Sequence, residues 1–426
     1  IGDGEDVMVK IAEVLTANCD KSKLEKLKLI EGFDGVYVPV LHKGKKRVRR
    51  AIVEDLDKTE FYDDQLVPYI NIVHDRASVE IQRGCTRGCR FCQAGIVYRP
   101  VRERSFKNNC ELIEKMIKNT GYSEISLSSL SSSDYSKIDD LIKGLKNRYE
   151  NRNLGISLPS LRMNPYSVQV ADDISGGKRT GFTFAPEAGS QRLRDIINKG
   201  VEEEDVLATA EAAIRGGWEN LKFYFMIGLP FETDEDVAEI FELASKVIKR
   251  CRPISKRINV TVSVSNFVPK PHTPFQWSEQ MDIEEMKRKH RILKDLFKTS
   301  KHCTLRIHDM RKSYLEGFLS RGDERTGDLI ELAWKKGAKL DDYKDNYDIW
   351  KSSADELGID EKDYLGGRNL EADLPWDMID IGVDKSFLLR EYKKAEEGAL
   401  TPDCREVCSG CGMKKRFPNC LKIATE

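Results

Sequence analysis

Between about residue 76 and residue 300, short apolar or alternating segments are separated by stretches with helical periodicity. Six of these segments carry the β-branched or aromatic residues that strands favour. They are Val79–Gln82, Glu124–Leu130, Leu154–Leu158, Gly181–Ala185, Leu221–Ile227 and Asn259–Val268. Strands that alternate with helices of ordinary length predict an α/β fold, with a parallel sheet covered by helices. The pattern fits a partial (β/α)6 barrel or an open doubly wound sheet, and periodicity alone does not separate the two.

The clearest helical pattern covers Asp234–Arg250, where apolar residues recur at intervals of three and four. Thr233 precedes this run and Asp236 lies three residues later, which is an acidic variant of the capping box. The pattern therefore predicts a helix that begins just after Thr233 and packs one face against the sheet.

The regions on either side of residues 76–300 differ from it in pattern. Residues 1–75 look like the tail of one domain followed by a connector, and residues 301–426 are mostly helical with a cysteine-rich end. The chain starts with neither a methionine nor a signal peptide, so we expect it to begin inside a longer protein. With 40% hydrophobic and 33% charged residues and no apolar run long enough for a bilayer, it predicts a soluble protein without a membrane partner.

The charge of the chain is balanced overall but locally uneven. The formal net charge is −1, so no global basic field indicates nucleic-acid binding. The segment Lys43–Arg50 nevertheless holds six basic residues in eight positions. It could contact the phosphates of RNA, or it could be a solvated hairpin edge.

Seven of the eleven cysteines fall into two tight groups. Cys85, Cys89 and Cys92 form the first, and Cys404, Cys408 and Cys411, followed by Cys420, form the second. Tight groups in a large chain favour metal ligation in a reducing compartment over a disulfide framework, so we expect a cytoplasmic protein.

The first group follows a predicted strand, at the strand end where α/β proteins bind ligands. Three closely spaced cysteines leave a tetrahedral zinc shell incomplete. Three thiolates on a cubane iron–sulfur cluster leave one iron without a protein ligand, and this iron can be chelated by the amino and carboxylate groups of a methionine moiety. The alternative is a zinc or structural cluster completed by a distant cysteine.

The loop Cys85–Cys92, with Phe91 before its last cysteine, resembles the cluster loop of the radical SAM superfamily. The longer stretch Arg83–Ser105 is similar to a subgroup usually fused to an amino-terminal cobalamin-binding-like domain, and Gly2-Asp3-Gly4-Glu5 resembles the end of such a domain. Further similar stretches follow in order: Ser126–Tyr135, Pro159–Arg162, Phe182–Gly200, Leu221–Thr233, Val268–Trp277 and Pro375–Cys411.

This resemblance implies a partial (β/α)6 TIM-like barrel with a helical C-terminal extension. It also implies an enzyme that reductively cleaves S-adenosylmethionine at a 4Fe-4S cluster to form a 5′-deoxyadenosyl radical, with flavodoxin or ferredoxin as the electron donor. The part that would carry a lower cobalt ligand is not in this sequence, so cobalamin binding stays open.

The resemblance also assigns residues to the two ends of the cofactor. Ser131 and Ser132 stand where the superfamily binds the methionine amino group, and Arg162 ends a motif that could meet the cofactor or the substrate. Glu187 stands where a polar side chain meets the ribose or methionine, or it could cap the following helix. Lys199 replaces an arginine that pairs with the methionine carboxylate.

At the other end of the cofactor, the resemblance places the backbone of Phe91 against the adenine. Tyr224 and Ile227 would border the adenine and ribose, although Ile227 also reads as a core residue. His272, between two prolines after the sixth strand, could donate a proton in the cavity or could be a structural turn residue. Arg99, Arg102 and Arg104 could bind an anionic substrate or position the cysteine loop.

The second cysteine group supplies four soft ligands near the carboxyl end. Cys404, Cys408 and Cys411 have the spacing of the first group, which favours an auxiliary iron–sulfur cluster, and zinc is the alternative. A metal there could be catalytic, or it could pin a short tail that cannot bury a core of its own.

The basic segment and the second group together favour modification of RNA or of a ribosomal component by methylation or sulfur insertion. A radical reaction on a small molecule is the first alternative, and it predicts negligible RNA binding. A non-catalytic iron–sulfur or zinc binding module is the second, and it predicts no 5′-deoxyadenosine.

Overall fold

Two parallel sheets form the centre of the protein in the computed structural model, which describes residues 1–42, 47–70, 72–150, 154–174, 181–339, 343–418 and 420. One sheet has the order β2-β5-β6 and the other β10-β9-β8-β7. All ladders in both sheets are parallel. The strands are β2 Ala77–Glu80, β5 Glu124–Ser128, β6 Gly155–Ser157, β7 Phe182–Glu187, β8 Asn220–Ile227, β9 Asn259–Asn266 and β10 Cys303–Ile307.

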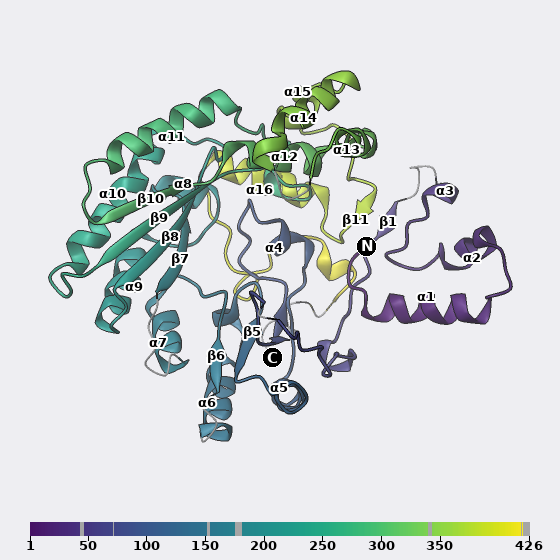
Figure 1. Ribbon diagram of the computed structural model, residues 1–426, viewed down its shortest axis with the longest axis horizontal. Coiled ribbons are helices and arrows are strands. Elements are labelled where there is room, and N and C mark those ends of the chain that lie inside the picture. Colours follow the sequence, from purple (N-terminus) through teal and green to yellow (C-terminus); the bar gives the residue numbers. More distant parts are fainter. Residues whose placement is uncertain are drawn as a thin grey trace.

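All six predicted strands are confirmed, each within a few residues of its expected bounds. The strands follow chain order around the molecule, which is the order of a partial barrel. Among the described residues no ladder joins β6 to β7, so the barrel is opened at that point into two sheets (Figure 1).

Helices follow the strands and cover the outer faces of the sheets. They are α5 Phe106–Thr120, α6 Ile138–Arg148, α7 Pro165–Ile174, α8 Gln191–Ile196, α9 Glu203–Arg215, α10 Asp234–Cys251 and α11 Ile283–Phe297. The expected start of α10 is confirmed. Thr233 donates its backbone N–H to Asp236 Oδ2 at 2.8 Å, and Asp236 N–H donates to Thr233 Oγ1 at 3.4 Å.

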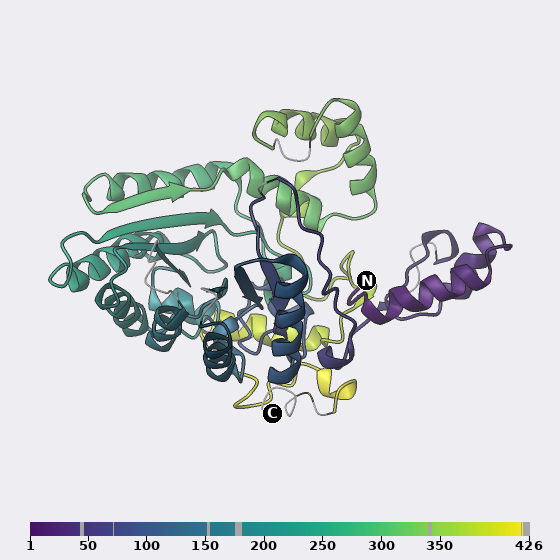
Figure 2. The ribbon, with the colours of Figure 1, turned by 60° about the horizontal axis from the view of Figure 1, so that its bottom comes forward.

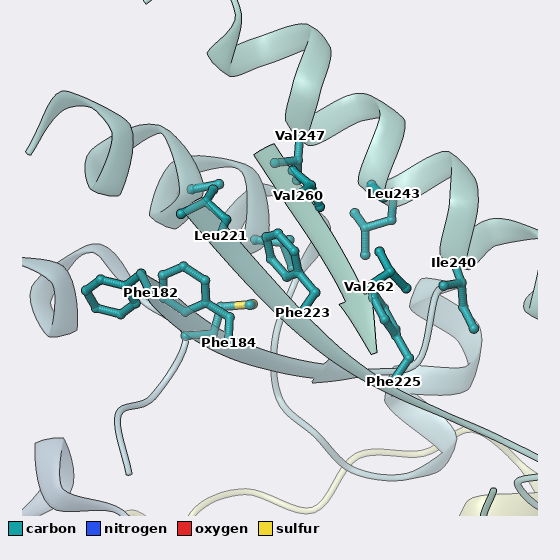
Figure 3. Packing of buried hydrophobic residues seen from close by; sticks show 14 of the residues in the cluster. Phe182, Phe184, Leu221, Phe223, Phe225, Ile240, Leu243, Val247, Val260 and Val262 are labelled. Carbon is teal, nitrogen blue, oxygen red and sulfur yellow. The ribbon is translucent and has the colours of Figure 1, made fainter. Parts of the chain in front are cut away.

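One face of the larger sheet packs against helices, and alternate residues of its strands make this contact (Figure 3). Leu221, Phe223 and Phe225 of β8 are buried against the apolar face of α10, which includes Ile240 and Leu243. Burial of each such side chain contributes about 2 kcal/mol. The intervening residues of β8 are only half-buried and face the other side of the sheet, where a ligand can reach them.

The strand β10 was not predicted. It pairs in register with β9 and continues the sheet beyond residue 300, where the sequence indicated a helical extension. Its five residues alternate apolar with polar, but they lie at the sheet edge among charged residues, so their local pattern is weak. Contact with β9 decides the conformation.

The amino-terminal region pairs with a segment of the carboxyl-terminal region. Near the amino end lie α1 Glu5–Ala17, α2 Lys23–Ile30, α3 Pro39–His42 and β1 Val48–Arg49, and β1 pairs with β11 Ile379–Asp380. The three helices project to one side of the sheets (Figure 2). A second projecting group contains α12 Met310–Arg321, α13 Arg325–Lys335, α14 Tyr343–Glu356 and α15 Glu361–Leu365.

The last part of the chain returns to the centre of the molecule. Helix α16 Lys385–Glu396 packs against α8, and the residues after it lie beside α4 Gln93–Val97, which follows the first cysteine group (Figure 1). Two short strands, β3 Gln82–Arg83 and β4 Arg102–Glu103, bracket this loop and pair with each other. Among the described residues, no helix has the length and apolar composition that crossing a bilayer requires.

Candidate functional site

The first cysteine group occupies a tightly folded loop between β3 and α4. Gly84 opens the loop at a φ of 89°, and a Cβ there would lie 2.6 Å from the Tyr98 carbonyl oxygen, so only glycine fits. Cys92 ends the loop as the N-cap of α4, where its Sγ accepts from the Gly95 N–H at 3.3 Å. The loop is therefore anchored at both ends.

The three thiols lie on one loop and are half-buried. Burial, together with a smaller contribution from the neighbouring Cys89, raises the pKa of Cys85 to about 11. Burial likewise raises the pKa values of Cys89 and Cys92. A bound metal reverses this preference because only thiolates ligate, so loading the site releases protons.

Lys199 and Glu187 form an ion pair beside this loop, with Nζ 3.3 Å from Oε1. Both side chains are less than one fifth exposed. Burial lowers the pKa of Lys199, but Glu187 and Cys89 outweigh burial and raise it. The ammonium also lies 5.9 Å from the centre of the Phe91 ring. The sequence placed these residues at one site, and the structure brings them together next to Cys89.

Arg162 reaches the same region from the loop after β6. Its Nη2 donates to the Gly200 carbonyl at 3.1 Å, one residue beyond Lys199. Burial lowers the pKa of Arg162, as does the nearby Arg87, while Asp134, Asp403 and the neighbouring Cys89 raise it. Arg162 thus completes a positively charged side of the space above Cys89.

Ser131 and Ser132 lie at the end of β5, as expected, but their hydroxyls are engaged within the protein. Ser131 Oγ donates to Asp134 Oδ2 at 2.7 Å, and Ser132 Oγ donates to the Leu127 carbonyl at 3.1 Å. Asp134 is the residue that sequence reasoning missed here. Arg87 of the cysteine loop donates to both carboxylate oxygens of Asp134. Burial raises the pKa of Asp134, but the hydrogen bonds and charge of Arg87 outweigh burial and lower this pKa to about 2.

Tyr224 and Ile227 lie on opposite faces of β8. The hydroxyl of Tyr224 accepts from Lys222 Nζ at 2.6 Å on the open face, where a ligand could contact both. Ile227 is fully buried in the core behind the strand. The side chain of Ile227 therefore has a packing role, and only its backbone is available at the strand end.

His272 adopts a φ of 59° in the turn after β9. Its backbone N–H donates to Gln276 Oε1 at 3.0 Å, while the preceding carbonyl of Pro271 accepts from Gln93 Nε2 at 3.0 Å. Because Gln93 follows Cys92, the turn lies beside the cysteine loop. Burial lowers the pKa of His272 to about 4, so the ring is neutral at neutral pH.

The arginines that follow the loop hold it in place. Arg102 is buried against Asp3 in an ion pair, and Arg104 donates to the Glu80 carbonyl at 3.3 Å. Since both guanidiniums are nearly inaccessible, the structure favours positioning over binding of an anionic substrate. Arg90 is equally buried and donates to Glu391 Oε2 at 3.2 Å and to the Ala399 carbonyl.

The basic segment Lys43–Arg50 is only partly described, because residues 43–46 lie outside the described residues. Arg47 and Arg49 are exposed and lie near Asp380 and Asp34. Arg50 is buried and donates from Nη2 to the Arg99 carbonyl at 2.6 Å. Half of the segment is thus a paired sheet edge rather than a free basic surface.

The second cysteine group lies directly behind the first. Cys404, Cys408, Cys411 and Cys420 line one cavity together with Cys85 and Arg99. Among the described residues, no three His, Cys, Asp or Glu side chains gather tightly enough for a single metal ion. The sequence predicted both groups but carried no signal that they adjoin.

Comparison with known proteins identifies the family of this chain. The profile of the radical SAM superfamily matches residues 79–244, which contain the first cysteine loop, Glu187 and Lys199. An uncharacterized protein of Methanocaldococcus jannaschii, MJ0966, is 31% identical over 331 residues, which are 75% of this chain and 70% of that protein. The chain belongs to the radical SAM superfamily. It is therefore a radical SAM enzyme.

Two further relatives match less of the chain. The uncharacterized methyltransferase PH0819 of Pyrococcus horikoshii is 24% identical, with 53% of this chain and 49% of that protein covered. The ribosomal protein uS12 methylthiotransferase RimO of Treponema denticola is 23% identical, with 41% and 42% covered. Among solved structures, the cobalamin-dependent radical SAM enzyme OxsB is 12% identical, with a TM-score of 0.36 over 81% of this chain and 58% of that one.

The residues of the first site fit the groups that the superfamily implies, a 4Fe-4S cluster and S-adenosylmethionine. Three thiols on one loop provide soft ligands for iron. The Lys199–Glu187 pair offers one charge of each sign, which is what the carboxylate and ammonium of an amino-acid moiety require.

Proposed function

We propose that Cys85, Cys89 and Cys92 hold the 4Fe-4S cluster and that S-adenosylmethionine binds between this loop and Lys199, Glu187 and Phe91. The observation that supports this most directly is the Lys199–Glu187 pair at 3.3 Å, buried beside Cys89. Apolar residues would pack in this position at least as well as an ion pair. The charges of Lys199 and Glu187 therefore favour a binding role.

When bound, the cluster supplies the electron that cleaves the cofactor to a 5′-deoxyadenosyl radical. The residues of the chain bind, orient and shield. Lys199 and Arg162 provide positive charge for the methionine carboxylate, and Glu187 accepts from the ammonium. Phe91 and Tyr224 border the adenosine, and the neutral imidazole of His272 belongs to the turn that lies beside the cysteine loop.

We further propose that the substrate is RNA or a ribosomal component, modified by methylation or sulfur insertion. Two relatives support this class: one is an uncharacterized methyltransferase and the other a methylthiotransferase of a ribosomal protein. Residues of the second cysteine group would hold a second iron–sulfur cluster, with zinc as the alternative.

A groove at the edge of the larger sheet adds support for an anionic substrate. It has a volume of about 880 Å³ and lies between α11, β10 and α12. Lys287, Lys294, Lys298 and Arg311 line it, together with the aromatic rings of Phe297 and Tyr347. Basic side chains beside aromatic rings suit single-stranded nucleic acid.

The decisive experiment is anaerobic reconstitution of the chain with iron and sulfide, followed by reduction with dithionite in the presence of S-adenosylmethionine. We expect 5′-deoxyadenosine from the wild type and none from Cys89→Ala. Product from Cys89→Ala, or none from a wild type with a full iron content, would refute the proposed site.

Binding of a fluorescent single-stranded RNA tests the substrate class. Affinity should fall steeply as salt rises, and Lys287→Ala/Lys294→Ala/Lys298→Ala should flatten that dependence by up to about two units of slope. Affinity that is negligible and insensitive to salt would favour a small-molecule substrate instead.

A further inference from the structure

The second cysteine group adjoins a defined side of the first. Cys404, Cys408, Cys411 and Cys420 share their cavity with Cys85 and not with Cys89 or Cys92. All four cysteines line this cavity, so their side chains border one common space. The cavity lies against the side of the cysteine loop that presents Cys85.

The cofactor side of the loop is a different one. Lys199 and Glu187 pair at 3.3 Å on that side, and the Lys199 ammonium lies 5.9 Å from the ring of Phe91, which stands just before Cys92. Among the described residues, the cavity of the second group is lined by Cys85, Thr86 and Arg99 of the loop region and by neither Lys199 nor Glu187. A metal in the second group would thus stand behind the first cluster as seen from the bound cofactor. In that position it could exchange electrons with the first cluster, while the substrate would approach from the opposite side.

Arg99 joins the two groups. Its guanidinium is buried, its Nη1 has no hydrogen-bond partner among the described residues, and its side chain lines the shared cavity. The cavity that it lines is bordered by Cys85 of the first group and by Cys404 and Cys411 of the second. One positive charge thus faces thiols of both groups, where it can offset the negative charge of two cysteine-ligated clusters.

The two segments are also held rigidly to each other. The Cys404 N–H donates to the Thr86 carbonyl at 3.2 Å, so the backbones of the two cysteine segments touch directly. Asn198, next to Lys199, donates to the Gly88 and Thr401 carbonyls at 3.2 and 3.1 Å and accepts from the Thr401 N–H at 2.9 Å. Rigid spacing between two redox centres keeps the electron-transfer distance constant.

The far side of the second group reaches the surface. Cys408 is exposed and the neighbouring Val407 is 57% exposed, whereas Cys85, Cys89 and Cys92 are half-buried. The basic residues Lys414 and Lys415 are exposed nearby. This exposed basic surface suits contact with an acidic electron-transfer protein.

We propose that Cys404, Cys408, Cys411 and Cys420 hold an iron–sulfur cluster that passes single electrons from a reduced flavodoxin or ferredoxin to the first cluster. This inference rests on the proposed function of the first site. The step forms and breaks no bond: the donor loses one electron, the second cluster gains it and then returns to its oxidised state as the first cluster is reduced. Sulfur donation to the substrate is a different role, and it would require the second group on the cofactor side.

The first test compares three anaerobically reconstituted full-length proteins. They are the wild type, Cys404→Ala/Cys408→Ala/Cys411→Ala, and a control with the same number of substitutions, Cys19→Ala/Cys110→Ala/Cys303→Ala. We expect about eight irons per chain for the wild type and the control and about four for the second-group variant. Equal iron in all three proteins, or zinc retained at the second group under iron-replete conditions, overturns the proposal.

The second test measures 5′-deoxyadenosine with two reductants. With dithionite, which can reduce the first cluster directly, the second-group variant should keep activity within about threefold of the wild type. With reduced flavodoxin its rate should fall at least about tenfold. A flavodoxin-driven rate equal to that of the wild type refutes the relay, and so does an equal loss with both reductants. Lack of product from the wild type with dithionite would instead refute the proposed function.

The third test needs no variant, so it holds even if the second-group protein folds poorly. The electron paramagnetic resonance spectrum of the fully reduced wild type should show magnetic coupling between two clusters. Spectra that are the plain sum of two isolated clusters would place the centres too far apart for a relay.

Discussion

Thr86, the residue after Cys85, donates a hydrogen bond from Oγ1 to Oδ2 of Asp403, the residue before Cys404, at 2.8 Å. The two residues are 317 positions apart in the chain and both are buried. Asp403 also pairs with Arg87 at 3.1 Å and with Arg405 at 3.2 Å. A single carboxylate thus ties the two cysteine segments together, and the surrounding cations outweigh burial and lower its pKa.

Replacing Asp403 should loosen this junction. Asp403→Ala leaves the Thr86 hydroxyl without its acceptor and removes one of the two carboxylates that Arg87 and Arg405 share, Asp134 being the other, so we expect the free energy of unfolding to fall by about 2 kcal/mol. Chemical denaturation under anaerobic conditions measures this. Asp295→Ala, which removes an exposed partner of Lys298, is the control and should change stability by less than about 0.5 kcal/mol. Equal effects of the two substitutions would show that the junction is not a stabilising contact.

Binding of S-adenosylmethionine should depend on the charge of Lys199. Lys199→Met removes the cation offered to the methionine carboxylate and leaves Glu187 beside it, so the dissociation constant should rise at least about tenfold, or about 1.4 kcal/mol. Lys199→Arg keeps the charge and should stay within about threefold. Calorimetric titration of the iron-loaded protein measures both constants.

The control for Lys199 is Lys246→Met, which breaks an exposed pair with Glu203. It should bind like the wild type. Unchanged binding by Lys199→Met would remove this residue from the cofactor site.

The sequence was sufficient to locate the six strands and the first cysteine loop because both depend on local patterns. Alternating apolar residues mark a strand, and three cysteines at fixed spacing mark a cluster loop. Thr233 and Asp236, three positions apart in the sequence, likewise predict the start of α10.

Other features depend on contacts that no local pattern records. The strand β10 exists because β9 offers a free edge, and Asp134 acquires its role only when Arg87 lies against it. The adjacency of the two cysteine groups depends on the C-terminal segment returning across the loop. Arg99 is the clearest example, because the sequence alone did not distinguish a role in substrate binding from a structural role for this residue.

The buried His290 should make the protein less stable in mild acid. Its Nε2 lies 2.7 Å from Asn266 Oδ1, and burial, with a smaller contribution from Lys294, lowers its pKa to about 4. In the unfolded chain the pKa is about 6.5. Because the folded state disfavours the proton, the stabilisation is complete above about pH 6.5 and is lost as the pH falls toward 4.

His290→Gln retains an amide near Asn266 but cannot titrate. The free energy of unfolding of the wild type should therefore fall more steeply than that of His290→Gln between pH 6.5 and 5, and the two should run parallel above pH 7. Urea denaturation at several pH values measures both curves. Parallel curves over the whole range would show that His290 is not the titrating group.

Arg99 should set the reduction potentials of both cysteine sites. Each cluster gains a negative charge when it is reduced, and the buried guanidinium between Cys85 and Cys411 favours that charge. Arg99→Gln removes the positive charge, so both midpoint potentials should become more negative. Arg99→Lys keeps the charge and should restore most of the shift. A redox titration followed by electron paramagnetic resonance measures the two potentials in each protein.

Arg99 also packs over the ring of Phe387 at 5.1 Å, so Phe387→Leu serves as a control for lost packing. If the potentials move in Phe387→Leu as they do in Arg99→Gln, packing and not charge controls the clusters. A shift of only one potential would place Arg99 with a single site.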